Sequence, residues 1–293
     1  MNLGRIITIA GIAVMASHAM AGDRAQLAMR MDDMGAMHSV NMAIMDAYNN
    51  GVGKSVEIMP VGAWYPEAVK LLKDAPGLDV GVHIAITSEW ENVKWGPLTQ
   101  APSLVDDMGY FNPMMWPNPA YPGQSVMEKG FDLAELEAEY RAQIERVMKD
   151  VPRVSHLSGH MGSLGFAPEV KEMVKRIAKE YGLGVVDLGG PDATYEGVGY
   201  AGGALDADGK HKSLEAKENA LVRTIEQLKP GKRYMFLDHP AYNDDEMSTV
   251  FHIGYEDVGF DRQGVTDLFK SKRVKKALED CNVELISVGE LTK

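Results

Sequence analysis

Cysteine is almost absent from this chain of 293 residues, in which Cys281 stands alone. A single cysteine cannot form a disulfide within the chain, and it excludes zinc ribbons and redox-active cysteine pairs. A chain of this length can nevertheless bury a substantial hydrophobic core. We therefore expect the fold to depend on that core rather than on covalent cross-links.

Long hydrophobic segments are also lacking. The apolar run from Ile6 to Ala16 is shorter than the roughly 20 residues that cross a bilayer. Arg5 precedes this run, and Ala19-Met20-Ala21 places small residues where signal peptidase needs them. These features predict a secretory signal peptide over residues 1–21 rather than an uncleaved anchor, and hence a secreted or periplasmic protein with no membrane contact after cleavage.

Positive charge is scarce relative to negative charge. The chain has 30 Lys and Arg residues against 42 Asp and Glu residues, a net charge of −12. Loss of Arg5 with the signal peptide would give 29 − 42 = −13. Such an acidic protein is not expected to bind nucleic acid or anionic lipid. We expect residues 22–293 to form a single domain, and the sequence leaves its oligomeric state open, a homodimer included.

Strand-like and helix-like segments alternate along the mature chain. Strands are expected at 27–31, 55–59, 78–84, 154–157, 183–188, 234–237 and 283–287, and helices at 40–48, 66–74, 133–147, 168–181, 213–228 and 265–279. Repeated βα units predict a parallel sheet, because parallel strands need crossover connections. The stretches 88–130 and 189–209 show no clear period and are expected to be loops. Trp90, Trp95, Tyr110 and Trp116 in the first stretch could stack on a ligand or form loop core.

Reactive side chains gather where predicted strands end. Asp32 and Asp33 follow the first strand, His83 ends the third, His160 follows the fourth and His239 follows the sixth. In a (β/α) barrel, the C-terminal ends of the strands converge on one rim, where ligands bind. An open doubly wound sheet would instead spread these residues along an edge. The pattern therefore favours an α/β, (β/α) barrel-like fold with about seven strands.

Two histidines and a carboxylate suit one divalent metal ion with positions left open for water. Bound water can deliver hydroxide near neutral pH, and a second carboxylate can take its proton. Structural alternatives remain, since the Asp pair could form a turn or helix cap and His83 could be a core histidine. We interpret His156 as structural, and His38, His211 and His252 as surface or loop residues.

Several short motifs occur in an order that is specific to one family. They are Met31-Asp32-Asp33-Met34-Gly35 with Val40-Asn41, the segments 81–87, 95–98, 156–163 and 238–242, and Glu284-Leu285-Ile286-Ser287. In these motifs the chain resembles the YdjC-like carbohydrate deacetylase family, which includes chito-oligosaccharide deacetylases. The resemblance extends from about residue 27 to residue 291 and so covers almost all of the mature chain.

The resemblance implies a barrel-like deacetylase that removes an acetyl group from an N-acetylated sugar or oligosaccharide. It implies that Asp32 is the general base and that Asp33, His83 and His160 bind the metal. His239 would protonate the leaving amine or stabilise the oxyanion. The metal implied is zinc or magnesium, and the histidine ligands favour zinc.

One residue departs from the family pattern. Ser158 stands where the family usually has Asp. If that Asp orients His160, its loss should weaken metal binding by about 10–100-fold. Two alternatives therefore stay open beside the deacetylase. One is another metal-dependent amidase or phosphoesterase, and the other is an exported sugar-binding protein with the same pocket but no activity.

Overall fold

The computed structural model describes residues 24–188, 193–203 and 213–293. The predicted signal peptide and His211 lie outside these residues. Within the described ranges, no helix combines the length and apolar character that a bilayer crossing requires.

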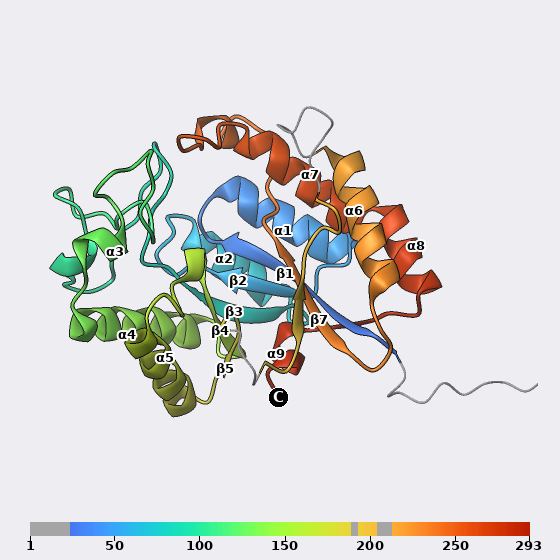
Figure 1. Cartoon of the computed structure of the whole chain (residues 1–293), viewed down its shortest axis with the longest axis horizontal. Helices are drawn as coiled ribbons and strands as arrows, with labels where there is room; N and C mark the ends of the chain where they lie inside the picture. The colour runs from blue at the N-terminus through green and yellow to red at the C-terminus, as the bar shows by residue number, and fades with distance from the viewer. Residues whose placement is uncertain (1–23, 189–192, 204–212) are drawn as a thin grey trace, which may run out of the picture.

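A parallel sheet forms the centre of the protein. Its strands are β1 (Gln26–Met34), β2 (Ser55–Ile58), β3 (Asp79–Ile84), β4 (His156–Gly159), β5 (Gly184–Val185), β6 (Glu196–Val198), β7 (Arg233–Asp238) and β8 (Glu284–Ile286). They follow the order β5-β4-β3-β2-β1-β7-β6, and β8 pairs with the start of β1. The sheet curls into a half-barrel, and in the described part of the chain its two ends, β5 and β6, do not pair (Figure 1). The predicted α/β, barrel-like fold is thus confirmed.

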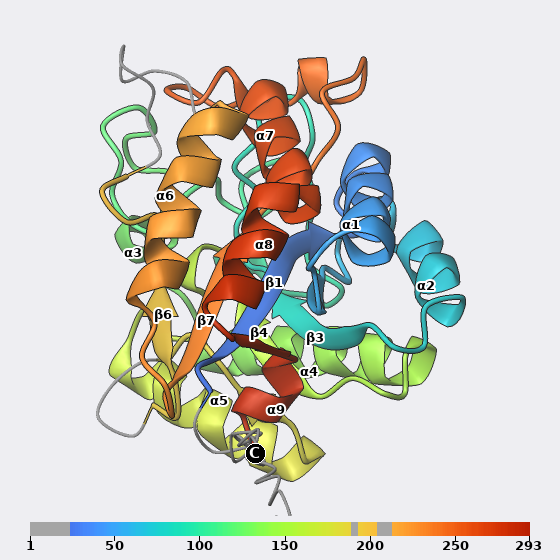
Figure 2. The same ribbon diagram turned by 90° about the vertical axis from the view of Figure 1, so that its right-hand side faces the viewer.

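Helices cover the sheet. They are α1 (His38–Asn50), α2 (Tyr65–Lys73), α3 (Val126–Lys129), α4 (Leu133–Asp150), α5 (Pro168–Tyr181), α6 (Leu214–Gln227), α7 (Val258–Lys270), α8 (Lys272–Asp280) and α9 (Val288–Leu291). Helices α6, α7 and α8 pack together beside β7, whereas α4 and α5 lie at the other end of the sheet (Figures 1 and 2). The site at the C-terminal ends of the strands therefore has helices on both flanks.

Local sequence signals explain where the longer helices begin and end. The Asp132 carboxylate accepts hydrogen bonds from the backbone N–H groups of Ala134 and Glu135 at the start of α4. Pro168 occupies the first turn of α5, and Gly182 ends this helix with a left-handed φ of 69°. Both helices were predicted from these same residues.

Other predicted boundaries were wrong. Strand β1 does not end before Asp32 but continues to Met34. The helix predicted over 265–279 is two helices, because Ser271 ends α7 and its hydroxyl caps α8. Strand β6 lies in the stretch predicted to be a loop, and the capped turn α9 was not predicted.

A buried ion pair joins α6 to α7. Lys217 Nζ lies 2.7 Å from Asp261 Oδ1, and the Lys217 side chain is 1% exposed. The other oxygen, Asp261 Oδ2, accepts a hydrogen bond of 2.6 Å from the Tyr255 hydroxyl. Because Tyr255 lines the cavity described below, this pair connects helix packing to the wall of the site.

We expect Lys217→Ala to lower the free energy of unfolding by about 3–5 kcal/mol, since it leaves the Asp261 carboxylate buried without its cation. Urea denaturation would measure the loss. Lys276→Ala is the matched control, because Lys276 pairs with Asp280 on the exposed surface of α8. A Lys217→Ala protein as stable as the control would show that the buried pair contributes nothing.

Candidate active site

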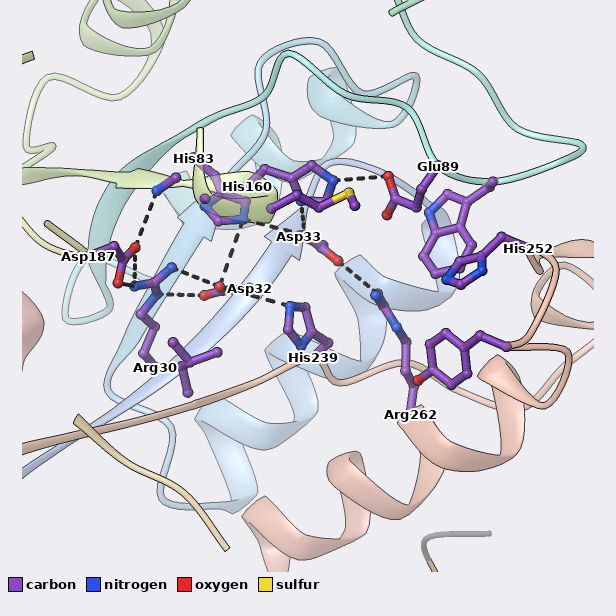
Figure 3. A pocket seen from close by; sticks show the side chains of 16 residues that line it. Arg30, Asp32, Asp33, His83, Glu89, His160, Asp187, His239, His252 and Arg262 are labelled. Atoms are coloured by element: carbon purple, nitrogen blue, oxygen red, sulfur yellow. Dashed lines mark hydrogen bonds and ion pairs between the residues drawn. The ribbon is translucent and has the colours of Figure 1, made fainter. Parts of the chain in front are cut away.

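One cavity of about 420 Å³ lies at the C-terminal ends of the strands. The residues predicted to form the site all line it, namely Asp32, Asp33, His83, His160 and His239. Charged residues that were not predicted line it too, and these are Arg30, Glu89, Asp187 and Arg262 (Figure 3). The half-barrel thus brings side chains from β1, β3, β7 and α7, and from the segment that follows β4, to one place.

The end of β1 turns two adjacent carboxylates toward the same cavity. Asp33 has a left-handed backbone with φ of 74°. The pairing of β1 with β2 also shifts register between Met31 and Met34. Adjacent side chains on a regular strand point to opposite faces. This irregularity is therefore what allows Asp32 and Asp33 to face the cavity together.

Three buried residues form a cluster that could hold a metal ion. Asp33 Oδ1 lies 3.5 Å from His83 Nε2 and 3.3 Å from His160 Nδ1. One ligand atom from each residue lies within 4.8 Å of the other two. The cluster contains the same Asp33, His83 and His160 to which the sequence assigned the metal.

The chemistry of this cluster fits a divalent metal ion. Asp33 Oδ1 is buried and has no hydrogen-bond partner. Such an orphaned acceptor is costly unless a cation satisfies it. Tetrahedral zinc with bonds of about 2.0–2.2 Å separates its ligand atoms by roughly 3.3–3.5 Å. The separations of 3.5 and 3.3 Å around Asp33 Oδ1 match that spacing.

A buried arginine holds the other oxygen of Asp33. Arg262 Nη1 lies 2.9 Å from Asp33 Oδ2. Burial opposes the charged form of Asp33, but Arg262 and the histidines outweigh it and hold its pKa well below the usual range. The carboxylate is therefore ionised, with one oxygen fixed by Arg262 and the other directed at the two imidazoles.

Glu89 orients His160 from the far side of the ring. His160 Nε2 lies 3.0 Å from Glu89 Oε2. Burial lowers the pKa of His160, but Glu89 and Asp33 outweigh it and raise the value to about 10. The His160 site thus attracts positive charge. A carboxylate behind a histidine is the usual outer partner of a metal ligand, because it fixes the ring and its tautomer.

The position of Ser158 corrects the interpretation drawn from the sequence. Its hydroxyl lies 2.9 Å from His83 Nδ1, so Ser158 contacts a different proposed ligand from the one expected. The register explains this contact, because β3 and β4 pair with His83 opposite Ser158. The carboxylate that supports His160 comes instead from Glu89.

Asp32 is held in a fixed orientation by Arg30. The guanidinium donates from Nε to Asp32 Oδ1 at 2.6 Å and from Nη2 to Oδ2 at 2.8 Å. The remaining nitrogen, Nη1, binds both oxygens of Asp187 at 2.8 Å. Asp32 Oδ2 also lies 3.8 Å from His83 Nε2. The Asp32 carboxylate is thereby positioned beside the Asp33, His83 and His160 cluster with almost no freedom.

His239 stands on the open side of Asp32. Its Nε2 lies 4.0 Å from Asp32 Oδ2, and its side chain is 35% exposed. Burial lowers the pKa of His239, but Asp33 and the contact with Asp238 outweigh this and raise it. His239 lines the cavity, and a histidine in such a position can, when protonated, donate its proton to a leaving group.

The other histidines that the structure describes lie in the core, on the surface and at the cavity. His156 is buried and binds Glu57 at 2.8 Å, in agreement with a structural role. His38 lies on the surface, 2.9 Å from Glu67. His252 lies in a loop, as expected, but it also lines the cavity and stacks on Trp90 with ring centroids 5.5 Å apart.

The sequence contained only weak signals for the missed residues. Arg30 is a charged residue inside an apolar strand, and such a residue needs a buried partner. Glu89 closely follows the predicted third strand. Asp187 and Arg262 carry no comparable pattern, since one follows a two-residue strand and the other lies on a helix.

Comparison with known proteins gives one family. A family model described as YdjC-like protein matches residues 26–280. Carbohydrate deacetylase 2 of Listeria innocua is 32% identical over 161 residues, which cover 54% of this chain and 58% of that protein. The carbohydrate deacetylase of Brevibacillus brevis is 25% identical over 274 residues, covering 91% of this chain and 99% of that protein.

Matches at about 30% identity are partial, since this chain spans little more than half the length of those curated relatives. A solved structure from Enterococcus faecalis V583, named as a candidate cellobiose-phosphate cleavage protein, has a TM-score of 0.71 and 23% identity. The match covers 92% of this chain and 100% of that structure. This likeness bears on the fold alone.

Proposed function

The chain belongs to the YdjC-like protein family, and on this premise we propose that it hydrolyses the acetamide bond of an N-acetylated carbohydrate. The observation that carries the proposal is the orphaned oxygen Asp33 Oδ1, buried between His83 and His160 at 3.5 and 3.3 Å. The names of the deacetylase relatives support the reaction class.

One divalent ion would be held by Asp33, His83 and His160. Two imidazoles and a carboxylate favour zinc over magnesium, which prefers oxygen ligands. A bound ion of this kind would polarise the acetyl carbonyl and make a water molecule acidic. The residues around the cluster supply the remaining proton transfers.

Asp32 takes the proton of the attacking water. The fork of Arg30 leaves Asp32 Oδ2 facing the cavity beside His83, so the base meets the water in one orientation. His239 gives its proton to the sugar nitrogen as the carbon–nitrogen bond breaks. The two residues share the same side of the cavity, with 4.0 Å between His239 Nε2 and Asp32 Oδ2.

We propose that the substrate is a neutral N-acetylated oligosaccharide met outside the cytoplasm. The signal-peptide composition of residues 1–21 and the acidic chain support this location and this charge preference. Trp116 supplies a candidate sugar platform. Its side chain is 51% exposed, and its ring packs directly on Gly162, where an added Cβ would lie 2.6 Å from the indole. Gly162 itself lines the cavity.

Trp116→Ala is expected to raise KM for an oligosaccharide by about 3–10-fold, because losing a stacking contact of about 1 kcal/mol weakens binding about fivefold. The kcat value should change little, since Trp116 lies outside the proton-transfer residues. Steady-state kinetics on N-acetylglucosamine oligomers would measure both constants. Trp64→Ala is the control, because Trp64 is 40% exposed and does not line the cavity.

Acetate release tests the proposed function. The purified protein, without residues 1–21, would be incubated with short N-acetylglucosamine oligomers in the presence of zinc, magnesium or a chelator. Chelator-sensitive acetate release is the expected result. A protein that binds zinc and the oligomers but releases no acetate would overturn the deacetylase and favour a sugar-binding role.

A further inference from the structure

A buried hydrogen-bond chain runs beneath His83 from β4 to β2. Ser158 Oγ lies 2.9 Å from His83 Nδ1, and the Ser158 hydroxyl donates to Glu57 Oε2. Glu57 and Ser158 are fully buried. Neither residue lines the cavity. They connect to it through the contact of Ser158 with His83 and the contact of Glu57 with Arg30.

Glycine at position 81 makes room for this chain. Strand β3 lies between β2 and β4, and Gly81 pairs with Glu57 on one side and with His156 on the other. A Cβ at Gly81 would lie 2.1 Å from Glu57 Oε2 and 2.4 Å from His156 Nε2. The absence of a side chain therefore allows Glu57 to reach across the central strand.

The surroundings of Glu57 keep it ionised. Glu57 Oε1 lies 2.8 Å from His156 Nε2 and 3.5 Å from Arg30 Nε. Burial opposes the charge, but His156 and Arg30 outweigh it and lower the pKa of Glu57 to about 2. An ionised carboxylate only accepts hydrogen bonds. The proton shared with Ser158 must therefore come from the serine.

The direction of that bond fixes the tautomer of His83. A serine hydroxyl has one hydrogen, and here Glu57 receives it. Ser158 Oγ must then accept from His83 Nδ1–H. A neutral imidazole with hydrogen on Nδ1 has its lone pair on Nε2. That nitrogen is the one that faces Asp33 Oδ1 at 3.5 Å.

We propose that Glu57, acting through Ser158 and across Gly81, is the carboxylate that positions His83 as a metal ligand. In this chain a glutamate on β2 and a serine on β4 together do what a single carboxylate at position 158 would do. The inference rests on the proposed metal site, and it makes Glu57 and Ser158 positioning residues rather than catalytic ones.

Two substitutions should each weaken zinc binding. In Ser158→Ala, His83 loses the acceptor that orients its ring. In Glu57→Gln, His156 and Arg30 should hold the carbonyl oxygen at the Oε1 position, so the amide nitrogen faces Ser158. The amide then donates to Ser158, and Ser158 donates to His83 Nδ1 instead of accepting from it. We expect zinc affinity to fall by about 10–100-fold in each variant. Competition with a chromogenic chelator would measure it.

A double variant provides the rescue. In Ser158→Asp with Glu57→Gln, the new carboxylate can accept from His83 directly while the glutamine amide donates to it. We expect its zinc affinity to lie within about threefold of wild type, and therefore to be higher than that of Ser158→Ala or Glu57→Gln. If Glu57 and Ser158 only pack in the core and do not position His83, we expect no rescue, because the double variant disturbs the core more than either single change.

Ser55→Ala is the matched control. Ser55 is a buried serine on β2 that donates to the carboxylate of Asp79 at 2.8 Å, outside the cavity. Its zinc affinity should equal that of wild type. Circular dichroism would establish that every variant is folded. Folded Ser158→Ala and Glu57→Gln proteins with wild-type zinc affinity would overturn the proposal.

The tautomer of His83 tests the chain without any substitution. Nitrogen-15 NMR of the zinc-free wild-type protein should show His83 protonated on Nδ1, and protonation on Nε2 alone would overturn the proposal even if a variant failed to fold. This measurement also distinguishes failure of the proposed metal site from failure of the proposed positioning of His83. Wild-type protein that binds no zinc would defeat the proposed function, whereas the tautomer would still decide whether Glu57 orients His83.

Discussion

Asp32→Asn is expected to lower kcat by about 10²–10⁴-fold while zinc stays bound, because an amide cannot accept the proton of the attacking water. Asp32 is not in the Asp33, His83 and His160 cluster, so the ion should keep its ligands. Acetate release would measure kcat, and metal analysis of the dialysed protein would measure zinc.

The control must separate loss of the base from disturbance of Arg30. An asparagine at position 32 offers Arg30 one acceptor where the carboxylate offers two. Asp187→Asn disturbs the same guanidinium from its other end and leaves the base intact. We expect only a modest loss of turnover in that variant. An equally large loss in Asp187→Asn would mean that the orientation of Arg30, rather than a base at Asp32, limits the reaction.

Loss of zinc from Asp32→Asn would have a different meaning. It would make Asp32 a ligand and would exclude the division of labour proposed for the two adjacent carboxylates. Retained turnover with retained zinc would show that the base lies elsewhere in the cavity, where Glu89 is the other buried carboxylate at the cluster.

The main features of the fold could be predicted because they depend on local patterns. Alternating strand-like and helix-like segments require a parallel sheet, and residues at the C-terminal ends of parallel strands meet at one rim. This geometry brings Asp33, His83 and His160 together although the first and the last lie 127 positions apart in the sequence.

The supporting residues could not be predicted because they depend on register. Glu57 meets Ser158 only because Gly81 lies between them on β3, and no spacing along the chain reveals a cross-strand relation of this kind. The sequence showed that Ser158 departs from the family pattern, but it did not show which histidine the serine contacts. The sequence shows that position 158 is a serine, but it does not show that Glu57, two strands away, is its hydrogen-bond partner.

The remaining differences between the predicted and the observed structure arise where the backbone is irregular. β1 was expected to end before Asp32, yet the strand continues and a left-handed residue at Asp33 turns both carboxylates inward. Arg262 reaches the same carboxylate from α7, on a helix whose start was placed seven residues too late. Sequence periodicity describes regular elements, and this site is built where regularity is interrupted.

Asp33→Asn is expected to weaken zinc binding more than the substitutions at Glu57 and Ser158 do. Arg262 Nη1 donates to Asp33 Oδ2 at 2.9 Å, so it should hold the carbonyl oxygen of the asparagine. The amide NH₂ group would then replace Asp33 Oδ1 and face His83 Nε2 and His160 Nδ1. An amide N–H group donates hydrogen bonds and does not bind a cation.

This orientation blocks the metal site in two ways. It removes one anionic ligand, and it occupies the lone pairs of both imidazoles with hydrogen bonds. Zinc binding of about 10–16 kcal/mol shared among four ligands gives roughly 2.5–4 kcal/mol for each one. We therefore expect zinc affinity to fall by at least about 100-fold, with turnover lost in proportion. Equilibrium dialysis against a zinc buffer would measure the change.

The same substitution at adjacent positions should thus separate two functions. Asp32→Asn should retain zinc without turnover, and Asp33→Asn should lose the zinc itself. Because the residues are neighbours and both are buried, at 3% and 2% exposed, a general disturbance of the end of β1 would affect both variants alike. Zinc affinity within about threefold of wild type in Asp33→Asn would remove Asp33 from the ligand set, since no amide held by Arg262 could replace a carboxylate there.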